Sequence, residues 1–449
     1  MRRHKLQIVA VIATGALISM AALADGTVRD PGVRTGAAGA GQPLKGLRSY
    51  ERTYFNAGLE AFDEAETLEE GLGPRFNLDG CAGCHAQPAT GGTSPALNPQ
   101  VTVATAFGAR NELPSFIRAN GPVREARFRS TPSGQPDGGV HALFVISGRN
   151  DGTGNASACR IIQEDFDRQV GRNNVALRIP TPTFGAGLME MIPDSVILAN
   201  LNVDAGTKSR LGIAGRVNRV GNDGTVGRFG WKAQNKSLMI FSGEAYNVEM
   251  GISNELFQSE REENANCQTA SVPNDTSTLD GATGVESVSD VERFSFFMRF
   301  LAPATPSAST PGGATSIANG RRAFLDVGCG QCHTPTLMTG DSTVPALRNQ
   351  NANLYSDLAL HGMGTGLADG VQQGTATGDE FRTAPLWGLG QRIFLLHDGR
   401  TTDLVQAIQA HASGSNSKYP ASEANGVVSQ FNSLSSRTRQ DLLNFLRSL

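Results

Sequence analysis

Two short motifs combine residue types that can attach and ligate a metal cofactor. Cys81–His85 reads Cys-Ala-Gly-Cys-His, and Cys329–His333 reads Cys-Gly-Gln-Cys-His. The pattern Cys-x-x-Cys-His is typical of c-type haem attachment, in which both thiols bond to the haem and the histidine ligates the iron. A redox Cys-x-x-Cys pair or half of a zinc site is the alternative. The chain has only 6 Cys and 7 His, so two matches to this pattern by chance are improbable. We therefore expect two covalently bound haems c.

The N-terminus has the pattern of a secretory signal peptide. Arg2, Arg3 and Lys5 precede an uncharged apolar run, and residues 22–24 read Ala-Leu-Ala, as at a cleavage site. An uncleaved membrane anchor is the alternative. Cleavage predicts a periplasmic protein without stable membrane insertion. Export also agrees with the haem prediction, because thioether attachment takes place outside the cytoplasm in bacteria.

The charge balance argues against nucleic acid as a partner. The signal peptide holds three of the 39 basic residues and none of the 42 acidic ones, so the mature chain carries a formal charge of −6. No basic cluster contradicts this exclusion. The mature length, about 425 residues, favours two or three modules over one small cytochrome domain.

Cys159 and Cys267 lie outside both haem motifs. In an oxidising compartment, an even remaining pair favours a disulfide. Two separate buried thiols are the alternative, because the sequence does not show whether the two cysteines approach each other.

Hydrophobic periodicity predicts a mainly α fold made of two cytochrome c-like domains. Helical patterns precede each motif, at 44–70 and 316–327, and two more lie at 291–301 and 435–449. Apolar runs at 140–146 and 175–179 predict strands, so loops and short strands would enlarge the N-terminal domain. The predicted division is a signal peptide at 1–24, a flexible segment at 25–43, the haem 1 domain at 44–301, a Pro/Ser/Gly-rich linker at 302–314 and the haem 2 domain at 315–449.

Several segments resemble the di-haem oxidoreductase family, whose members are sometimes described as thiol oxidoreductases. That family is related to bacterial di-haem cytochrome c peroxidases, and more distantly to the methylamine dehydrogenase maturation enzyme and the rubber oxygenases. The resemblance covers the chain from about Leu47 to the C-terminus. The segments that carry it are 121–128, 139–144, 180–190, 227–233, 382–388 and 397–400.

The resemblance implies a second axial ligand for the iron of the C-terminal haem, in addition to His333. In related peroxidases a Met for the C-terminal haem follows a His-Asp-Gly segment, and here the corresponding position is His411. We therefore expect a bis-His haem 2 with a lowered potential. A surface role for His411 is the alternative, with Met363 as the next candidate ligand. His361 and His397 should approach the same haem, and His397, beside Asp398 and Arg400, could bind a propionate.

The first haem has no obvious second ligand. His141 lies in an apolar strand and reads as a core histidine, which leaves the sixth position open for peroxide. Peroxide chemistry needs a general acid/base. Glu190, in a Gly-rich apolar segment, is the first candidate and Glu125 the second, with structural roles as the alternative for both. Trp231 is preferred over Trp387 as an electron bridge between the haems. Packing in the hydrophobic core is the alternative role for Trp231.

These features predict a periplasmic di-haem oxidoreductase, and specifically a peroxidase that reduces hydrogen peroxide at haem 1. A periplasmic donor, a small cytochrome or cupredoxin, would supply electrons through haem 2. The alternatives are an electron-transfer cytochrome without substrate turnover and a haem-dependent oxygenase of an organic substrate. Related peroxidases hold calcium between their domains, so Ca²⁺ is a further expectation, although no ligand loop in the sequence compels it.

Overall fold

The computed structural model describes residues 27–221, 223–261 and 264–449. The predicted signal peptide therefore lies outside the described residues. Within them, helices make up 32% of the chain and strands 11%. The expected mainly α fold thus holds as an excess of helix over strand, with much of the chain in loops.

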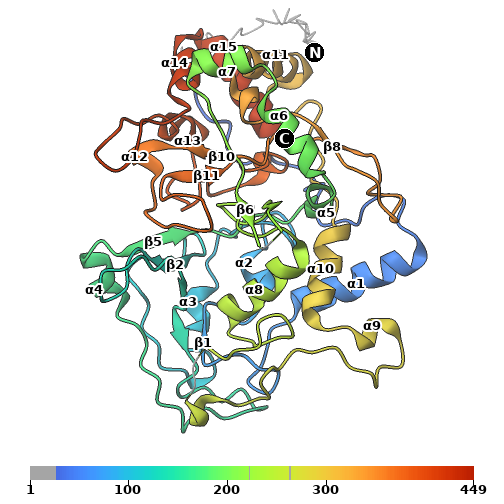
Figure 1. Cartoon of the computed structure of the whole chain (residues 1–449), viewed down its shortest axis with the longest axis vertical. Helices are drawn as coiled ribbons and strands as arrows, with labels where there is room; N and C mark the ends of the chain where they lie inside the picture. Colours follow the sequence, from blue (N-terminus) through green and yellow to red (C-terminus); the bar gives the residue numbers. More distant parts are fainter. Residues whose placement is uncertain (1–26, 222, 262–263) are drawn as a thin grey trace, which may run out of the picture.

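The first haem motif lies in a lower unit built around two crossing helices, α1 and α10 (Figure 1). Phe55 and Phe62 of α1 face Phe297 of α10, so the apolar stripe of each helix is buried against the other. Gly58 permits the close crossing, because a Cβ there would lie 2.2 Å from the carbonyl oxygen of Arg293. The helices of this unit are α1 Ser49–Asp63, α2 Cys81–Cys84, α3 Gln100–Val103, α4 Phe166–Gly171, α5 Ala186–Glu190, α8 Leu238–Met250, α9 Gly284–Ser287 and α10 Asp290–Phe300. Two further helices of this part of the sequence, α6 Asp194–Leu201 and α7 Ala205–Leu211, lie beside the upper unit (Figure 1).

The second motif lies in an upper unit with a crossing of the same kind, between α11 and α15. Here Gly320 allows the approach, since an added Cβ would lie 1.9 Å from the carbonyl oxygen of Asp441. Phe324 and Phe445 pack across the contact with ring centroids 5.4 Å apart. The helices are α11 Gly313–Asp326, α12 Gly364–Leu367, α13 Leu404–Ala410, α14 Asn425–Ser433 and α15 Ser436–Ser448, with short 3₁₀ turns at Cys329–Gln331 and Leu389–Gln391. Two more 3₁₀ turns, Ala106–Gly108 and Ala265–Cys267, belong to the lower unit.

The strands are short and form small antiparallel sheets. The predicted strand at 140–146 is interrupted, and its two halves pair with different partners. The pairs are β1 Arg75–Phe76 with β4 Phe144–Val145, β2 Glu125–Phe128 between β3 Val140–His141 and β5 Val175–Arg178, β6 Arg219–Val220 with β7 Thr225–Val226, β8 Leu337–Met338 with β9 Asn351–Ala352, and β10 Leu360–Gly362 with β11 Glu380–Arg382. The three-stranded sheet matters for the site because it carries Glu125 and Arg178.

The segments predicted as a flexible N-terminus and a free linker instead pair with each other. Pro43 forms an isolated β-bridge with Leu301, and the amide of Thr305 donates to the carbonyl of Gly39. Further upstream, the buried carboxylate of Asp30 accepts 2.6 and 2.8 Å bonds from Arg447 of α15. Backbone pairing and a buried ion pair thus hold both segments, which composition alone did not indicate.

Cys159 and Cys267 form a disulfide, with their Cα atoms 4.7 Å apart. The predicted pairing is therefore confirmed. The bridge links two loop segments of the lower unit that are 108 residues apart in the sequence. No helix in the described part of the chain has the length and apolar character needed to cross a membrane.

Replacing both bridge cysteines by serine should lower the free energy of unfolding by about 2–5 kcal/mol, because the unfolded chain then regains the entropy of a long open loop. Denaturant unfolding of the haem-loaded double variant against the parent measures this change. Equal midpoints for the two proteins would show that the bridge does not constrain the unfolded chain.

Candidate functional site

The first cavity opens beside α2 and lies between α8 and the three-stranded sheet. Cys81, Cys84 and His85 line one side of it. The Nδ1 atom of His85 lies 2.9 Å from the carbonyl oxygen of Gly92. This contact fixes the ring and leaves Nε2 free, as in histidines that ligate a metal. Burial lowers the pKa of His85, which keeps the imidazole in the neutral form a metal binds.

The second cavity is lined by Cys329, Cys332, His333 and His411. The Nδ1 atom of His333 lies 2.9 Å from the carbonyl oxygen of Tyr355, and that of His411 lies 2.7 Å from the carbonyl oxygen of Ala407. Both rings therefore keep Nε2 free, as His85 does. Burial lowers the pKa of His333 to about 4 and also lowers that of His411. Because α13 ends at Ala410, it delivers His411 directly to the cavity wall.

His361 also lines the second cavity but is engaged on both sides of its ring. Its Nδ1 lies 2.7 Å from a carboxylate oxygen of Glu423, and its Nε2 lies 3.0 Å from one of Asp357. Neither nitrogen is left for a metal. Met363 lines the same cavity and remains the alternative to His411.

His397 belongs to an aromatic group at the wall of the second cavity. Its ring stacks on Phe381 at a centroid distance of 4.3 Å and meets Trp231 edge-on at 6.3 Å. Burial lowers the pKa of His397 to about 4, so the ring is neutral at physiological pH. Its neighbour Arg400 is exposed and pairs with Asp398 instead of pointing at the cavity.

Trp231 lies in the wall that the two cavities share. Its side chain lines both, together with Ile179 and Pro180. The indole Nε1 donates a 2.8 Å hydrogen bond to the carbonyl oxygen of Ile179, which fixes the ring in this wall. Trp387 is buried but lines neither cavity. The structure thus places Trp231, and not Trp387, between the two cavities, and its role as an electron bridge stays a prediction.

Two carboxyl groups meet at the first cavity, Glu125 from β2 and Glu249 from α8. They share a hydrogen bond, so one proton must lie between them. Burial alone would raise the pKa of Glu125, but Arg127, whose Nε lies 2.6 Å from its carboxylate, lowers it below the usual range. Burial and the neighbouring Glu125 charge raise the pKa of Glu249 well above normal. Glu125 is therefore the ionised member and Glu249 holds the proton.

Glu190 lies at the end of α5 and lines neither cavity. One carboxylate oxygen lies 2.8 Å from Nε of Arg299, and the other accepts a 2.8 Å bond from the amide of Leu238. These contacts join three helices. The sequence offered two candidate carboxylates. Glu125 lines the first cavity, whereas Glu190 lies outside it in an ion pair with Arg299. His141 also lies away from both cavities, stacked on Phe128 at 3.7 Å.

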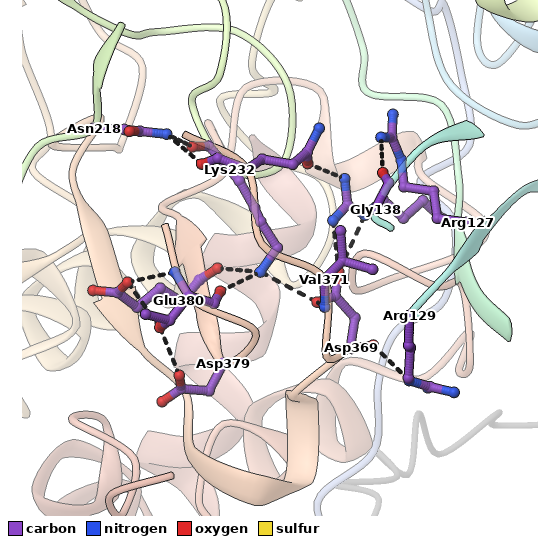
Figure 2. A network of polar contacts seen from close by, with 12 residues as sticks. Arg127, Arg129, Gly138, Asn218, Lys232, Asp369, Val371, Asp379 and Glu380 are labelled. Carbon is purple, nitrogen blue, oxygen red and sulfur yellow. Dashed lines mark hydrogen bonds and ion pairs between the residues drawn. The ribbon is translucent and has the colours of Figure 1, made fainter. Parts of the chain in front are cut away.

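A buried ion network extends from the first cavity into the upper unit. Arg178, which lines this cavity, donates bonds of 2.6 and 3.2 Å to one oxygen of Asp369. Figure 2 shows Lys232 reaching the same aspartate, with its Nζ 3.2 Å from the other oxygen. Lys232 also lies 4.1 Å from the ring centroid of Phe381. Burial lowers the pKa of Lys232 to about 8, although Asp369 opposes that shift.

Sequence reasoning missed Glu249, Arg178 and Asp369. Tyr246 and Glu249, three residues apart on α8, share one face of that helix and both line the cavity. Helical spacing could have indicated the shared face. No sequence pattern shows which partner that face meets.

The donor sets fit a haem in each cavity. Each cavity offers two thiols and one histidine with a free Nε2, and His411 adds a second imidazole to the upper one. Among the described residues that line the first cavity, His85 is the sole histidine. In the described ranges no group of three or more His, Cys, Asp or Glu side chains is arranged to hold a metal ion, so the calcium site stays a prediction.

Comparison with known proteins gives one family. The family model described as "Di-haem oxidoreductase, putative peroxidase" matches residues 140–449, which include the second haem motif and exclude the first. No curated protein matches the sequence.

Three solved structures are similar to this chain at low identity. The diheme peroxidase BthA from Burkholderia thailandensis E264 has 14% identity and a TM-score of 0.37, covering 94% of this chain and 95% of its own. Kuenenia stuttgartiensis hydrazine synthase has 14% identity and a TM-score of 0.34, covering 99% and 100%. A MauG-like protein associated with microbial copper homeostasis has 15% identity and a TM-score of 0.32, covering 60% and 90%.

Proposed function

Because the chain belongs to the di-haem oxidoreductase family, we propose that it is a periplasmic peroxidase that reduces hydrogen peroxide at the first cavity. The observation that carries this proposal is the carboxyl pair Glu125–Glu249 at that cavity, where the described lining offers no imidazole beyond His85. A carboxyl pair of this kind would place a proton acceptor and a proton donor beside a haem bound in this cavity.

The four motif cysteines would hold both haems covalently. Addition of each thiol S–H across a vinyl C=C bond gives a thioether with no leaving group. His85 would ligate the first iron, and His333 and His411 the second. The haems supply the iron-centred electron transfer that amino-acid side chains cannot provide.

Reduction of hydrogen peroxide to two waters consumes two electrons and two protons. In our proposal, ionised Glu125 accepts the proton of the near peroxide oxygen, and Glu249 gives its proton to the leaving oxygen, which departs as the first water. The proton held by Glu125 and one proton from solvent, with the two electrons, complete the second water. Arg127 keeps Glu125 ionised through the 2.6 Å contact with its carboxylate. Electrons come from a small cytochrome or cupredoxin to the second cavity and cross the wall that contains Trp231.

Two features support an exported protein. The N-terminal sequence has the composition of a signal peptide, and the bridge Cys159–Cys267 suits an oxidising compartment. Calcium between the two units is the least supported part of the prediction.

Optical and EPR spectra of the oxidised, fully loaded protein test the peroxidase proposal. We expect one low-spin haem and one high-spin haem, with only the high-spin signal changed by hydrogen peroxide. Two haems that remain low-spin after partial reduction would favour the electron carrier. Turnover of an organic compound with dioxygen, without peroxide consumption, would favour the oxygenase.

A further inference from the structure

Two buried arginines at the wall of the second cavity have no acidic partner in the described part of the chain. Arg382 is 5% exposed and Arg392 is 9% exposed, and both line the cavity. Among the described residues, their hydrogen bonds go to backbone carbonyls only. Arg382 donates to Gly230 and Thr383, and Arg392 donates to Pro385 and Trp387.

Other buried arginines of this chain are paired with carboxylates. Arg178 contacts Asp369, Arg228 contacts Asp194 and Arg447 contacts Asp30. This difference matters because a buried charge is costly unless it is paired and hydrogen-bonded.

The pKa values of Arg382 and Arg392 also indicate that the two guanidinium groups need a counter-ion. Burial lowers the pKa of Arg382 and of Arg392 to about 10, and the charge of Arg392 further disfavours that of Arg382. Asp357 acts on Arg382 only from a distance, and its own carboxylate is bound to His361. Both guanidinium groups remain charged at neutral pH, and their hydrogen bonds to backbone carbonyls supply no counter-charge.

We propose that Arg382 and Arg392 together form the anion site for the two propionates of the haem in the second cavity. This inference rests on the proposed presence of that haem and not on peroxide turnover. Two guanidinium groups match two carboxylates in charge, and each offers the fork of N–H donors that carboxylates accept.

The location of the pair fixes how the haem lies. Both arginines also line a small space between the two cavities, together with Trp231 and Thr183. A haem bound by these two arginines would have its propionates at the shared wall, and His333 and His411 are the residues that would ligate its iron.

The arginine pair would also affect the redox potential of this haem. Pairing each propionate with a guanidinium cancels negative charge that would otherwise stabilise the oxidised iron, so the arginines oppose the lowering of the potential caused by two imidazole ligands.

Potentiometric titration of the fully loaded Arg392→Met variant tests this role. The midpoint potential of the second haem should fall relative to the parent, while that of the first haem stays unchanged. Arg392→Lys, which keeps the charge, should restore most of the difference. Arg228→Met is the matched control, because Arg228 is equally buried, pairs with Asp194 and lines neither cavity. It should lower stability and leave both potentials unchanged.

Unchanged potentials in both Arg392→Met and Arg382→Met, with full haem content by pyridine haemochrome assay, would overturn the inference. If these variants do not fold, resonance Raman spectra of the parent protein decide. We expect propionate bending bands at the frequency of strongly hydrogen-bonded carboxylates, and bands typical of solvated propionates would contradict the assignment. A protein with two haems but no peroxidase activity would refute the proposed function alone. A protein lacking the second haem would refute this inference together with the electron relay.

Discussion

Glu125→Gln should reduce the rate of peroxide turnover by about 10²–10⁴-fold, because the amide can no longer accept the peroxide proton. The haem content and the spectra of the oxidised protein should stay as in the parent, since Glu125 contacts Arg127 and Glu249 and none of the three histidines assigned as ligands. Steady-state peroxide consumption with a reduced donor, measured at equal haem content, checks this result.

Glu190→Gln is the matched control for Glu125→Gln. Glu190 is also a largely buried carboxylate paired with an arginine, but it lines neither cavity. We expect a loss of stability with a turnover rate close to that of the parent. The opposite pattern, an inactive Glu190→Gln and an active Glu125→Gln, would return the catalytic role to the residue that the sequence ranked first.

The pH dependence of turnover should report the protonation of the Glu125–Glu249 pair. Burial and the Glu125 charge raise the pKa of Glu249 well above its usual value, so the pair retains a proton at neutral pH. As the pH rises through this raised pKa, the proton is lost and turnover should fall. Glu249→Gln keeps a hydrogen-bond donor but can neither ionise nor deliver a proton, so turnover should be lower than in the parent and its alkaline decline should disappear. A decline of equal size in Glu249→Gln would assign it to another group.

His411→Gly should convert the second haem from low spin to high spin, because an imidazole is removed from the iron and a cavity is left in its place. Added free imidazole should fill the cavity and restore the low-spin spectrum. In His411→Met a thioether replaces the imidazole, and the potential of the second haem should rise. EPR spectroscopy and potentiometry of the fully loaded variants measure both effects.

The neighbouring histidines provide the controls for His411. His361→Gln and His397→Gln should keep the second haem low-spin, since one ring is held between two carboxylates and the other packs between aromatic rings. An unchanged spectrum in His411→Gly would exclude this ligand. Loss of the low-spin signal in Met363→Leu would then assign the role to Met363, which lines the same cavity.

The sequence predicted the elements that depend on local pattern. The two haem motifs, the crossing helices α1, α10, α11 and α15 and the short strand β5 all follow from spacing and periodicity. The disulfide followed from counting the cysteines that the motifs leave over. The structure places His411 at the wall of the second cavity, and its role as an axial ligand stays a prediction.

The sequence could not predict contacts that depend on tertiary structure. Glu125 and Glu249 belong to a strand and a helix that are far apart in the chain, and neither residue has a neighbour that indicates the other. Glu190 was preferred because its surroundings are apolar, yet Arg299 from α10 reaches it and forms an ion pair. Arg382 and Arg392 look like ordinary surface charges in the sequence, and only their burial shows that they need a partner.

The pairing of the segment around Pro43 with the segment around Leu301 gives the chain a particular topology. Residues 44–301 leave and re-enter the upper unit side by side, and in between the chain returns to it, since α7 packs against α14 and Arg216 forms a β-bridge with Leu360. Several passes of the chain therefore join the two units, and they resist rotation better than a single tether. The backbone thus restrains the distance between the two cavities on either side of Trp231.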